Sequence, residues 1–315
     1  WIEFKNDSLF TDFNNFERHP EEPLFSDIEY LEDDSNAKIG KHLFGKVRYS
    51  DAGEWKNGTA DITRTVYLNR HYTHTSTKPF RVDKLEVRAD KILSVLNQKL
   101  VVTDSLKLNG EGVKGAEIRL IGTSQLIQTH KGTAKVTGGG KILIDRKSEI
   151  ASVYRYNYMS SPVITDLATN TYTVAGAFKD GTTPLNATDA IGETIAKDLN
   201  FTGNWDGKIE NGSPYISTRW IYTFARAAGN MSNWKRKGKD DEINATDGFI
   251  FKGPGVAQNY TFAGSPNDGE LKTKKIGKNQ SYLVGNPFSS ALNGAKFLYD
   301  NRNSIEGTLY FWDHV

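Results

Sequence analysis

Hydrophobic residues in this chain occur in short runs that alternate with polar positions and end at glycine, asparagine or proline. From about Lys46 onward several stretches have an apolar or aromatic residue at every second position, as at Val47 and Tyr49. An alternation of period two places one set of side chains on one face of a β-strand. The turn residues between runs indicate many short strands. The pattern therefore predicts an all-β protein with sparse helical signals: one or two turns over 187–196, and a short helix over 294–301 that has Asn293 as its N-cap.

Residues 80–150 have a different pattern, in which aliphatic pairs recur between turns rich in Asn, Asp and Gly. The pairs are Leu85/Val87, Ile92/Leu93, Leu100/Val102, Leu106/Leu108, Ile118/Leu120, Leu126/Ile127 and Ile142/Ile144. Such a segment can fold as a β-solenoid, in which each rung buries its aliphatic side chains against the next one. A meander of hairpins would give a similar pattern. The residues alone leave both folds open, and in either fold we expect the pairs to point inward.

The changes in pattern divide the chain into three parts. Residues 1–79 are predicted to be an irregular segment with some β-structure, and residues 80–150 the solenoid-like or meander segment. Residues 151–315 are predicted to be an antiparallel, jelly-roll-like β-sandwich, because short aromatic runs stand beside turn sequences there. The aromatic runs expected to form strands are Phe249–Phe251, Tyr260–Phe262, Tyr282–Val284 and Leu309–Trp312.

Composition and charge narrow the function classes. The chain has no Cys, which excludes a disulfide scaffold, a thiolate zinc site and a cysteine nucleophile. Its 40 basic and 38 acidic side chains leave a net charge of +2, so no general field favours nucleic acid. No apolar run is long enough to span a membrane, so none is predicted to do so.

No catalytic constellation stands out in the sequence. There is no Gly-x-Ser-x-Gly elbow, no His-Glu-x-x-His sequence and no phosphate-binding loop. A glycosidase needs two carboxylates at a set separation, and nothing in the sequence joins two of the acidic residues in this way. The acidic residues considered are Asp145, Glu149, Asp166, Asp206 and Asp268. We therefore predict that the chain is not an enzyme.

Two loops rich in oxygen ligands are candidates for binding calcium, the one cofactor considered. Calcium prefers hard oxygen donors such as carboxylates and amide carbonyls. One loop offers Asp180, Asn186 and Asp189, and the other offers Asp268. Neither loop matches the helix–loop–helix calcium pattern, and the same residue types also form plain turns.

Aromatic residues gather between 205 and 234, next to basic residues. Trp205, Trp220, Trp234 and Arg236 are the candidates for binding glycan. An aromatic ring can stack on the apolar face of a sugar, and a guanidinium can bind an acidic group. The alternative is that the alternating aromatic residues of 220–224 face the core of the sandwich.

Four sequence motifs in a fixed order connect the chain to a known family. They are Tyr156–Val163 (YNYMSSPV), Gly248–Gly255 (GFIFKGPG), Leu283–Leu292 (LVGNPFSSAL) and Thr308–His314 (TLYFWDH). Their order and spacing resemble the series YNYWSSPV, GYIFKGPG, LVGNPYPSALD and LYFWDH. That series is found in large cell-surface proteins that gliding and related Gram-negative bacteria export by type IX secretion. The resemblance covers residues 150–315.

The resemblance implies an extracellular or cell-surface location and a non-catalytic structural or binding role of the adhesin type. It also favours the solenoid, because such a segment commonly precedes the Tyr-Asn-Tyr motif in the family. The implied partners are the type IX export machinery, other surface proteins and glycans. Two alternatives stay open: an extracellular β-domain that binds or degrades polysaccharide, and a passive secretion cargo held with its export machinery.

Three further expectations come with this family. O-glycans at Asp-Ser/Thr-aliphatic triplets would fall on Ser8 and Ser105. The chain begins at Trp1 rather than Met, so we expect a piece of a longer product, with the sandwich cut at its C-terminal end. We expect the motif residues to form the internal framework of the sandwich rather than a substrate cleft. They are Tyr156, Tyr158, Pro162, Asn286, Pro287, Phe311 and Trp312.

Overall fold

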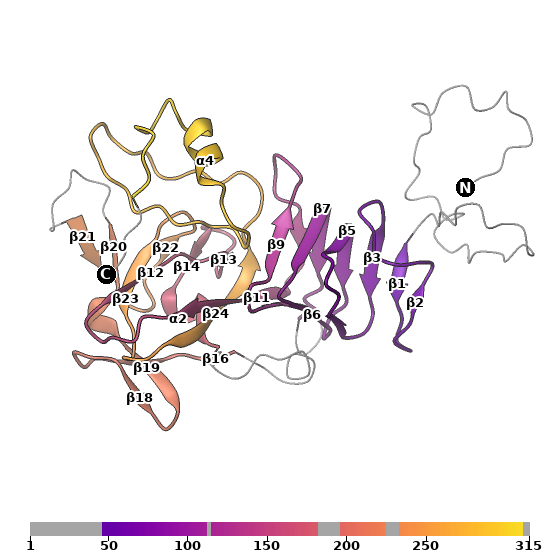
Figure 1. The fold of residues 1–315 in the computed structure, drawn as a ribbon, viewed down its shortest axis with the longest axis horizontal. Coiled ribbons are helices and arrows are strands. Elements are labelled where there is room, and N and C mark those ends of the chain that lie inside the picture. The colour runs from indigo at the N-terminus through magenta and orange to yellow at the C-terminus, as the bar shows by residue number, and fades with distance from the viewer. Residues whose placement is uncertain (1–45, 112–114, 182–195, 225–232, 311–315) are drawn as a thin grey trace, which may run out of the picture.

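The computed structural model describes residues 46–111, 115–181, 196–224 and 233–310. Strands dominate this part of the chain, and the prediction of an all-β protein is confirmed (Figure 1). The helical elements described are α2 (Val174–Ala177), the 3₁₀ turn η3 (Thr218–Trp220) and α4 (Gly294–Asp300). Helix α4 lies where the sequence predicts it. The side chain of Asn293 caps the helix by accepting a hydrogen bond from the Lys296 amide at 2.9 Å.

Residues 47–144 form a β-solenoid, in which the strands other than β2 pair in parallel with the strand one rung away (Figure 1). One group of strands is β1 (Val47–Tyr49), β2 (Trp55–Lys56), β3 (Thr65–Leu68), β5 (Phe80–Val87), β7 (Lys99–Leu108), β9 (Gln125–Gln128) and β10 (Val136–Thr137). The other group is β4 (Tyr72–His74), β6 (Ile92–Leu96), β8 (Glu117–Ile121) and β11 (Lys141–Ser148). A hairpin meander would pair neighbouring strands antiparallel, and within the solenoid only β1 and β2 do so in the described residues.

The first group folds into two sides of the solenoid. Strands β5 and β7 shift register between Val82 and Lys84. The first half of β7 pairs with β9, and its second half pairs with β10. Each rung therefore turns through three short strand segments, which explains why the strands are short and why Asn and Gly recur between them.

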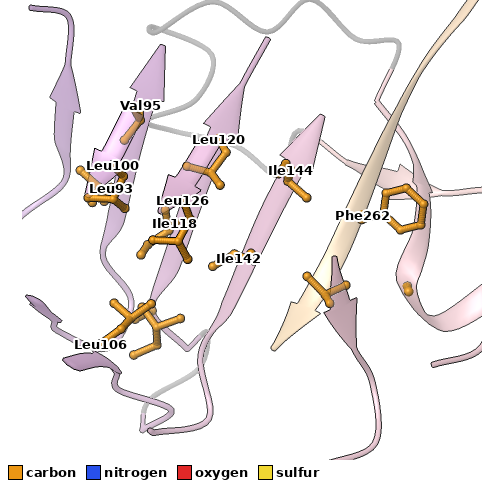
Figure 2. Packing of buried hydrophobic residues seen from close by; sticks show 14 of the residues in the cluster. Leu93, Val95, Leu100, Leu106, Ile118, Leu120, Leu126, Ile142, Ile144 and Phe262 are labelled. Carbon is orange, nitrogen blue, oxygen red and sulfur yellow. The ribbon is translucent and has the colours of Figure 1, made fainter. Parts of the chain in front are cut away.

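Aliphatic side chains stack in columns through the solenoid. Leu93, Ile118 and Ile142 are register partners on successive strands, and Figure 2 shows them side by side. Val95, Leu120 and Ile144 form a parallel column, and Val66, Leu85 and Leu106 form another on a different side. All nine residues are 0% or 1% exposed. This stacking supplies the core of a fold whose individual rungs are too small to bury one.

Two details of the predicted segment differ from the structure. The solenoid begins before the expected boundary at residue 80, because β1 and β3 already pair in parallel from Val47. Two of the expected inward pairs consist of adjacent residues, so their members point to opposite faces. Ile92 and Ile127 are half-buried, while Leu93 and Leu126 fill the core.

Strand β24 (Gln258–Pro266) joins the solenoid to the C-terminal sheets. It pairs antiparallel with β11 from Ile142 to Ser148, and on its other side with β13 (Val163–Ile164) and β15 (Phe178–Asp180). Phe262 of β24 therefore lies between Ile144 and Phe178. Rings of the C-terminal core pack around this strand, with the ring centres of Phe178 and Tyr260 4.5 Å apart. The two parts share one strand and one hydrophobic core.

The remaining strands form small antiparallel sheets around this core, apart from one parallel pair, β17 with β19. One sheet has the order β12-β23-β20-β21. Its strands are β12 (Tyr156–Met159), β23 (Phe249–Lys252), β20 (Tyr222–Phe224) and β21 (Trp234–Arg236). The others are β14 (Thr171–Tyr172), β22 (Ile243–Asn244), β16 (Lys197–Asp198), β17 (Asn200–Thr202), β19 (Ser213–Ser217) and β18 (Lys208–Glu210).

The prediction of a strand at Tyr282–Val284 is wrong, and the predicted strand at Leu309–Trp312 lies only partly in the described residues. At Tyr282–Val284 the structure has only an isolated bridge between Val284 and Asp247, and residues 309–310 are not a strand. Phe311 and Trp312 lie outside the described residues. This region is held by side-chain hydrogen bonds rather than by strand pairing. Asn267 Nδ2 donates a hydrogen bond to the Pro287 carbonyl at 2.7 Å. The expected framework role fits Pro162 and Pro287, which are buried.

Candidate glycan-binding surface

The sheet β12-β23-β20-β21 has one face in the core and one face that points outward. Phe249 and Phe251 of β23 face the core and are 0% exposed, and Thr223 of β20 lies on the same side. Register partners in antiparallel strands share a face, so the residues that alternate with these three point outward. The residues on this outward side are Tyr156, Tyr158, Ile250, Lys252, Tyr222, Phe224, Trp234 and Arg236, here called the aromatic face; Ile250 among them is only 5% exposed.

Aromatic rings and a lysine pack together at one end of the aromatic face. Trp220 of η3 lies edge-on to Tyr156, with ring centres 6.5 Å apart. Lys252 Nζ lies 3.7 Å from the centre of the Trp220 ring and 5.3 Å from that of Tyr156. Partial burial raises the pKa of the Tyr156 hydroxyl, and the nearby Tyr222 and Tyr158 raise it further. The three tyrosines are therefore close neighbours on this surface.

An exposed tryptophan stands next to this cluster. Trp205 is 64% exposed, and its ring centre lies 5.6 Å from that of Trp220. The guanidinium of Arg219 lies 4.8 Å from the centre of the Trp205 ring. An indole of this size is usually buried, because it removes a large apolar area from water. Leaving it on the surface has a cost in stability that needs a reason.

Hydrogen bonds from η3 and β19 hold the loop that carries Trp205. Arg219 Nε donates to the Gly203 carbonyl at 2.6 Å, and Trp220 Nε1 donates to the Trp205 carbonyl at 2.5 Å. Ser217 Oγ donates to the Asn204 carbonyl at 2.6 Å. Three successive backbone carbonyls are thus satisfied by side chains. The exposed ring sits on a preorganised loop.

The structure places the aromatic residues of 220–224 away from the core. Ile221 and Thr223 are the buried residues of this stretch, while Tyr222 and Phe224 lie half-buried on the aromatic face. Trp234 lies on the same face, edge-on to Phe224 with ring centres 5.2 Å apart, and Arg236 is paired with Tyr222. The interpretation that these residues fill the core is wrong.

Sequence reasoning missed four residues of this region. Tyr156 and Tyr158 were assigned to the internal framework, but the structure places both half-buried on the aromatic face, where Tyr156 contacts Trp220. The alternation in Phe249–Lys252 could have placed Lys252 opposite the two buried phenylalanines. Nothing in the sequence shows that β12 lies beside β23. Arg219 was missed because its role depends on the fold of the loop at 203–206.

Of the residues considered as calcium ligands, the structure describes Asp268 and Asp180. Both Asp268 oxygens already accept hydrogen bonds: one lies 2.7 Å from His130 Nε2, and the other accepts from the Lys135 and Val136 amides at 2.5 and 3.0 Å. This carboxylate ties the turn after β24 to the last rung of the solenoid. Asp180 is 5% exposed beside Tyr260, and Asn186 and Asp189 lie outside the described residues. Among the described residues no three His, Asp or Glu side chains cluster as a metal site would require.

Of the two predicted O-glycosylation sites, the structure describes Ser105, which lies in the solenoid. Ser105 lies in β7, half-buried, and faces away from the column that contains Leu106. The neighbouring Asp104 pairs with Lys135 and lies 3.8 Å from Lys84. Ser8 lies outside the described residues.

Comparison with known proteins adds one family match. Residues 201–315 match the model of a family described as a domain of unknown function (DUF8693). No curated protein matches the chain, and no solved structure matches it. The matched region begins in β17 and contains Trp205, Trp220 and Lys252. It does not form its sheets alone, because β23 pairs with β12 and β24 with β11.

None of the helices in the described part of the chain has the length and apolar character that a membrane crossing requires.

Proposed function

We propose that this chain is a non-catalytic, adhesin-like binding segment of a large type IX-secreted cell-surface protein, and that its aromatic face, together with the neighbouring Trp205, Trp220 and Arg219, binds polysaccharide. The observation that carries the proposal is the exposed Trp205 ring on a loop fixed by side-chain hydrogen bonds. A ring that is held rigid before binding loses little conformational entropy when a ligand stacks on it. Sugars present flat apolar faces that suit such a ring.

The shape of the molecule supports a binding role. In Figure 1 the solenoid runs from β1 and β2 at one end toward the C-terminal sheets, and β20 and β21 lie at the opposite end. A stack of rungs with a continuous core is a rigid spacer. The aromatic face is therefore presented at the end of the molecule away from the first rung, as suits an adhesin.

The export part of the proposal is supported by the four motifs of residues 150–315. Its test is surface labelling of intact producing cells with an antibody against this chain, before and after the type IX secretion genes are deleted. Surface signal that depends on those genes is expected. A protein found in the cytoplasm of both strains would overturn this part.

The binding part is tested with a panel of purified polysaccharides and the variant Trp205→Ala. The parent chain should retain at least one polysaccharide, and Trp205→Ala should weaken that binding by about tenfold or more. The matched control is Tyr299→Ala on α4. This ring is 65% exposed and also carries an arginine 4.3 Å from its centre, that of Arg302. Both variants should melt like the parent, because neither ring is in the core.

Two outcomes would contradict the binding proposal: a parent chain that retains no polysaccharide, or Trp205→Ala binding as tightly as Tyr299→Ala. The same incubations test the non-catalytic part. Release of reducing ends from any bound polysaccharide would show that the chain is a glycosidase instead.

A further inference from the structure

We infer that the polysaccharide bound by the aromatic face is acidic, a chain of sugars that carry carboxylate or sulfate groups. This inference rests on the proposed function and specifies its ligand. It starts from the positions of three cations, each next to an aromatic ring. Lys252 lies over Trp220 and Tyr156, Arg219 lies over Trp205, and Arg236 is the cross-strand partner of Tyr222.

The charges around these cations are the second observation. Within the described residues no carboxylate lies at ion-pair distance from any of the three. Some lysines of the solenoid do have such partners, as Lys107 pairs with Glu86 at 3.1 Å and Lys141 with Glu117 at 3.1 Å. The net charge of the whole chain is only +2, so a polyanion would be attracted by these local cations rather than by the chain as a whole.

The rings and the cations can bind different parts of an acidic sugar. A sugar stacked on an indole presents its substituents around its edge, where a neighbouring cation can reach an anionic group. Arginine binds carboxylate or sulfate through paired N–H groups, and the ammonium of Lys252 keeps its N–H donors while it lies over the ring. A neutral sugar would use the rings and leave the cations without a partner.

The cations are also spread along the surface. Lys252 on β23 and Arg236 on β21 share the aromatic face and are separated by β20. Two strand spacings correspond to about 10 Å. This separation suits a polymer with repeated charges better than a single small anion.

The test compares polygalacturonate with its carboxyl-reduced, uncharged form, by calorimetric titration of the full chain. The charged polymer should bind at least about tenfold more tightly, and its affinity should fall as salt is raised. Lys252→Met, which keeps the alkyl stem over the rings, and Arg236→Gln should each weaken the charged polymer several-fold. Neither should change binding of the reduced form. Lys99→Gln, an exposed lysine on β7, is the control and should bind like the parent.

The outcomes separate the inference from the proposed function. Equal binding of both polymers would overturn the acidic ligand while the glycan surface stands. No binding of either polymer, and none of the wider panel, would overturn the proposed function itself. A sulfated glycan bound more tightly than polygalacturonate would identify sulfate as the anion and support the inference. Single-stranded DNA bound as tightly as any glycan would overturn it, since stacked bases and phosphates can use the same groups.

Discussion

At the scale of single residues, Leu120 shows what a position in a solenoid column requires. It is 0% exposed between Val95 and Ile144. Leu120→Asp would bury an unpaired carboxylate there, so we expect a loss of several kcal/mol and an unfolded solenoid. Ile127→Asp, at a half-buried outward position, is the control and should cost much less. Circular dichroism melts check this, and a Leu120→Asp variant that melts like the parent would contradict the assignment of the columns.

A second residue, Asp145, predicts a pH dependence. It is 4% exposed and accepts hydrogen bonds from Thr261 Oγ1 at 2.8 Å and from the Gly122 amide at 3.3 Å. Burial raises the pKa of its carboxyl above the usual 3.8, and these bonds and the charge of Arg119 only partly oppose the shift. The stability that Asp145 contributes is therefore complete below about pH 3.8 and is lost as the pH rises through the folded-state pKa.

The variant Asp145→Asn removes this titration. Relative to the parent, its free energy of unfolding should increase between pH 3.8 and neutral pH, because only the parent loses stability by ionising there. Urea unfolding of both proteins at several pH values measures the difference. If the difference in unfolding free energy between the two proteins is constant with pH, or decreases from pH 3.8 to neutral pH, Asp145 is not held in a desolvated site.

At the scale of elements, the turn between β10 and β11 depends on Gly138. Its φ is +91°, and a Cβ there would lie 1.9 Å from the Leu108 carbonyl oxygen. Gly132 also has a positive φ, +84°, but a Cβ there would meet nothing within 4 Å. Gly132→Ala should cost about 1–2 kcal/mol for the left-handed backbone. Gly138→Ala should cost about 1–3 kcal/mol more, because the neighbouring rung must move. Equal losses of stability in the two variants, measured by thermal denaturation, would contradict this packing.

The elements also show which parts of the fold the sequence could predict. The aliphatic pairs of 80–150 identified the strands there, because every pair places at least one side chain in the core. The earlier rungs were missed because their inward residues include Tyr49, Trp55 and Tyr72, which stack on one another instead of forming aliphatic pairs. The run Tyr282–Val284 has the composition of a strand, but Tyr282 uses its hydroxyl to donate to the Thr246 carbonyl at 2.8 Å. Composition cannot distinguish such a loop from a strand.

The candidate site was predictable only in part, for a related reason. Trp205, Trp220, Trp234 and Arg236 could be selected as rings and a cation close together in sequence. Their exposure depends on which face of the sheet that contains β21 meets the core and on the fold of the loop at 203–206, and the sequence left both open. The part of β12 in the site could not be predicted, because Tyr156 of β12 and the Trp220 that it contacts are far apart in the chain.

At the scale of the whole molecule, β24 makes the solenoid and the C-terminal sheets one cooperative unit. Phe262 is 0% exposed and contacts both parts, with its ring centre 5.0 Å from that of Phe178. We expect a single unfolding transition, and Phe262→Ala should destabilise it by about 3–5 kcal/mol while keeping it single. Phe297→Ala on α4, at a half-buried position, should have a much smaller effect. Two separate transitions by calorimetry would show that the parts fold independently.

The central claim is that Trp205 and Trp220 form a ligand surface, and their indole N–H signals test it most directly. In ¹⁵N-labelled full chain titrated with an oligogalacturonate, the signals of Trp205 and Trp220 should shift as the ligand saturates. The signal of Trp55, in the first rungs of the solenoid, should stay in place. Shifts of Trp55 alone, or no shift of any indole at saturating ligand, would contradict the claim.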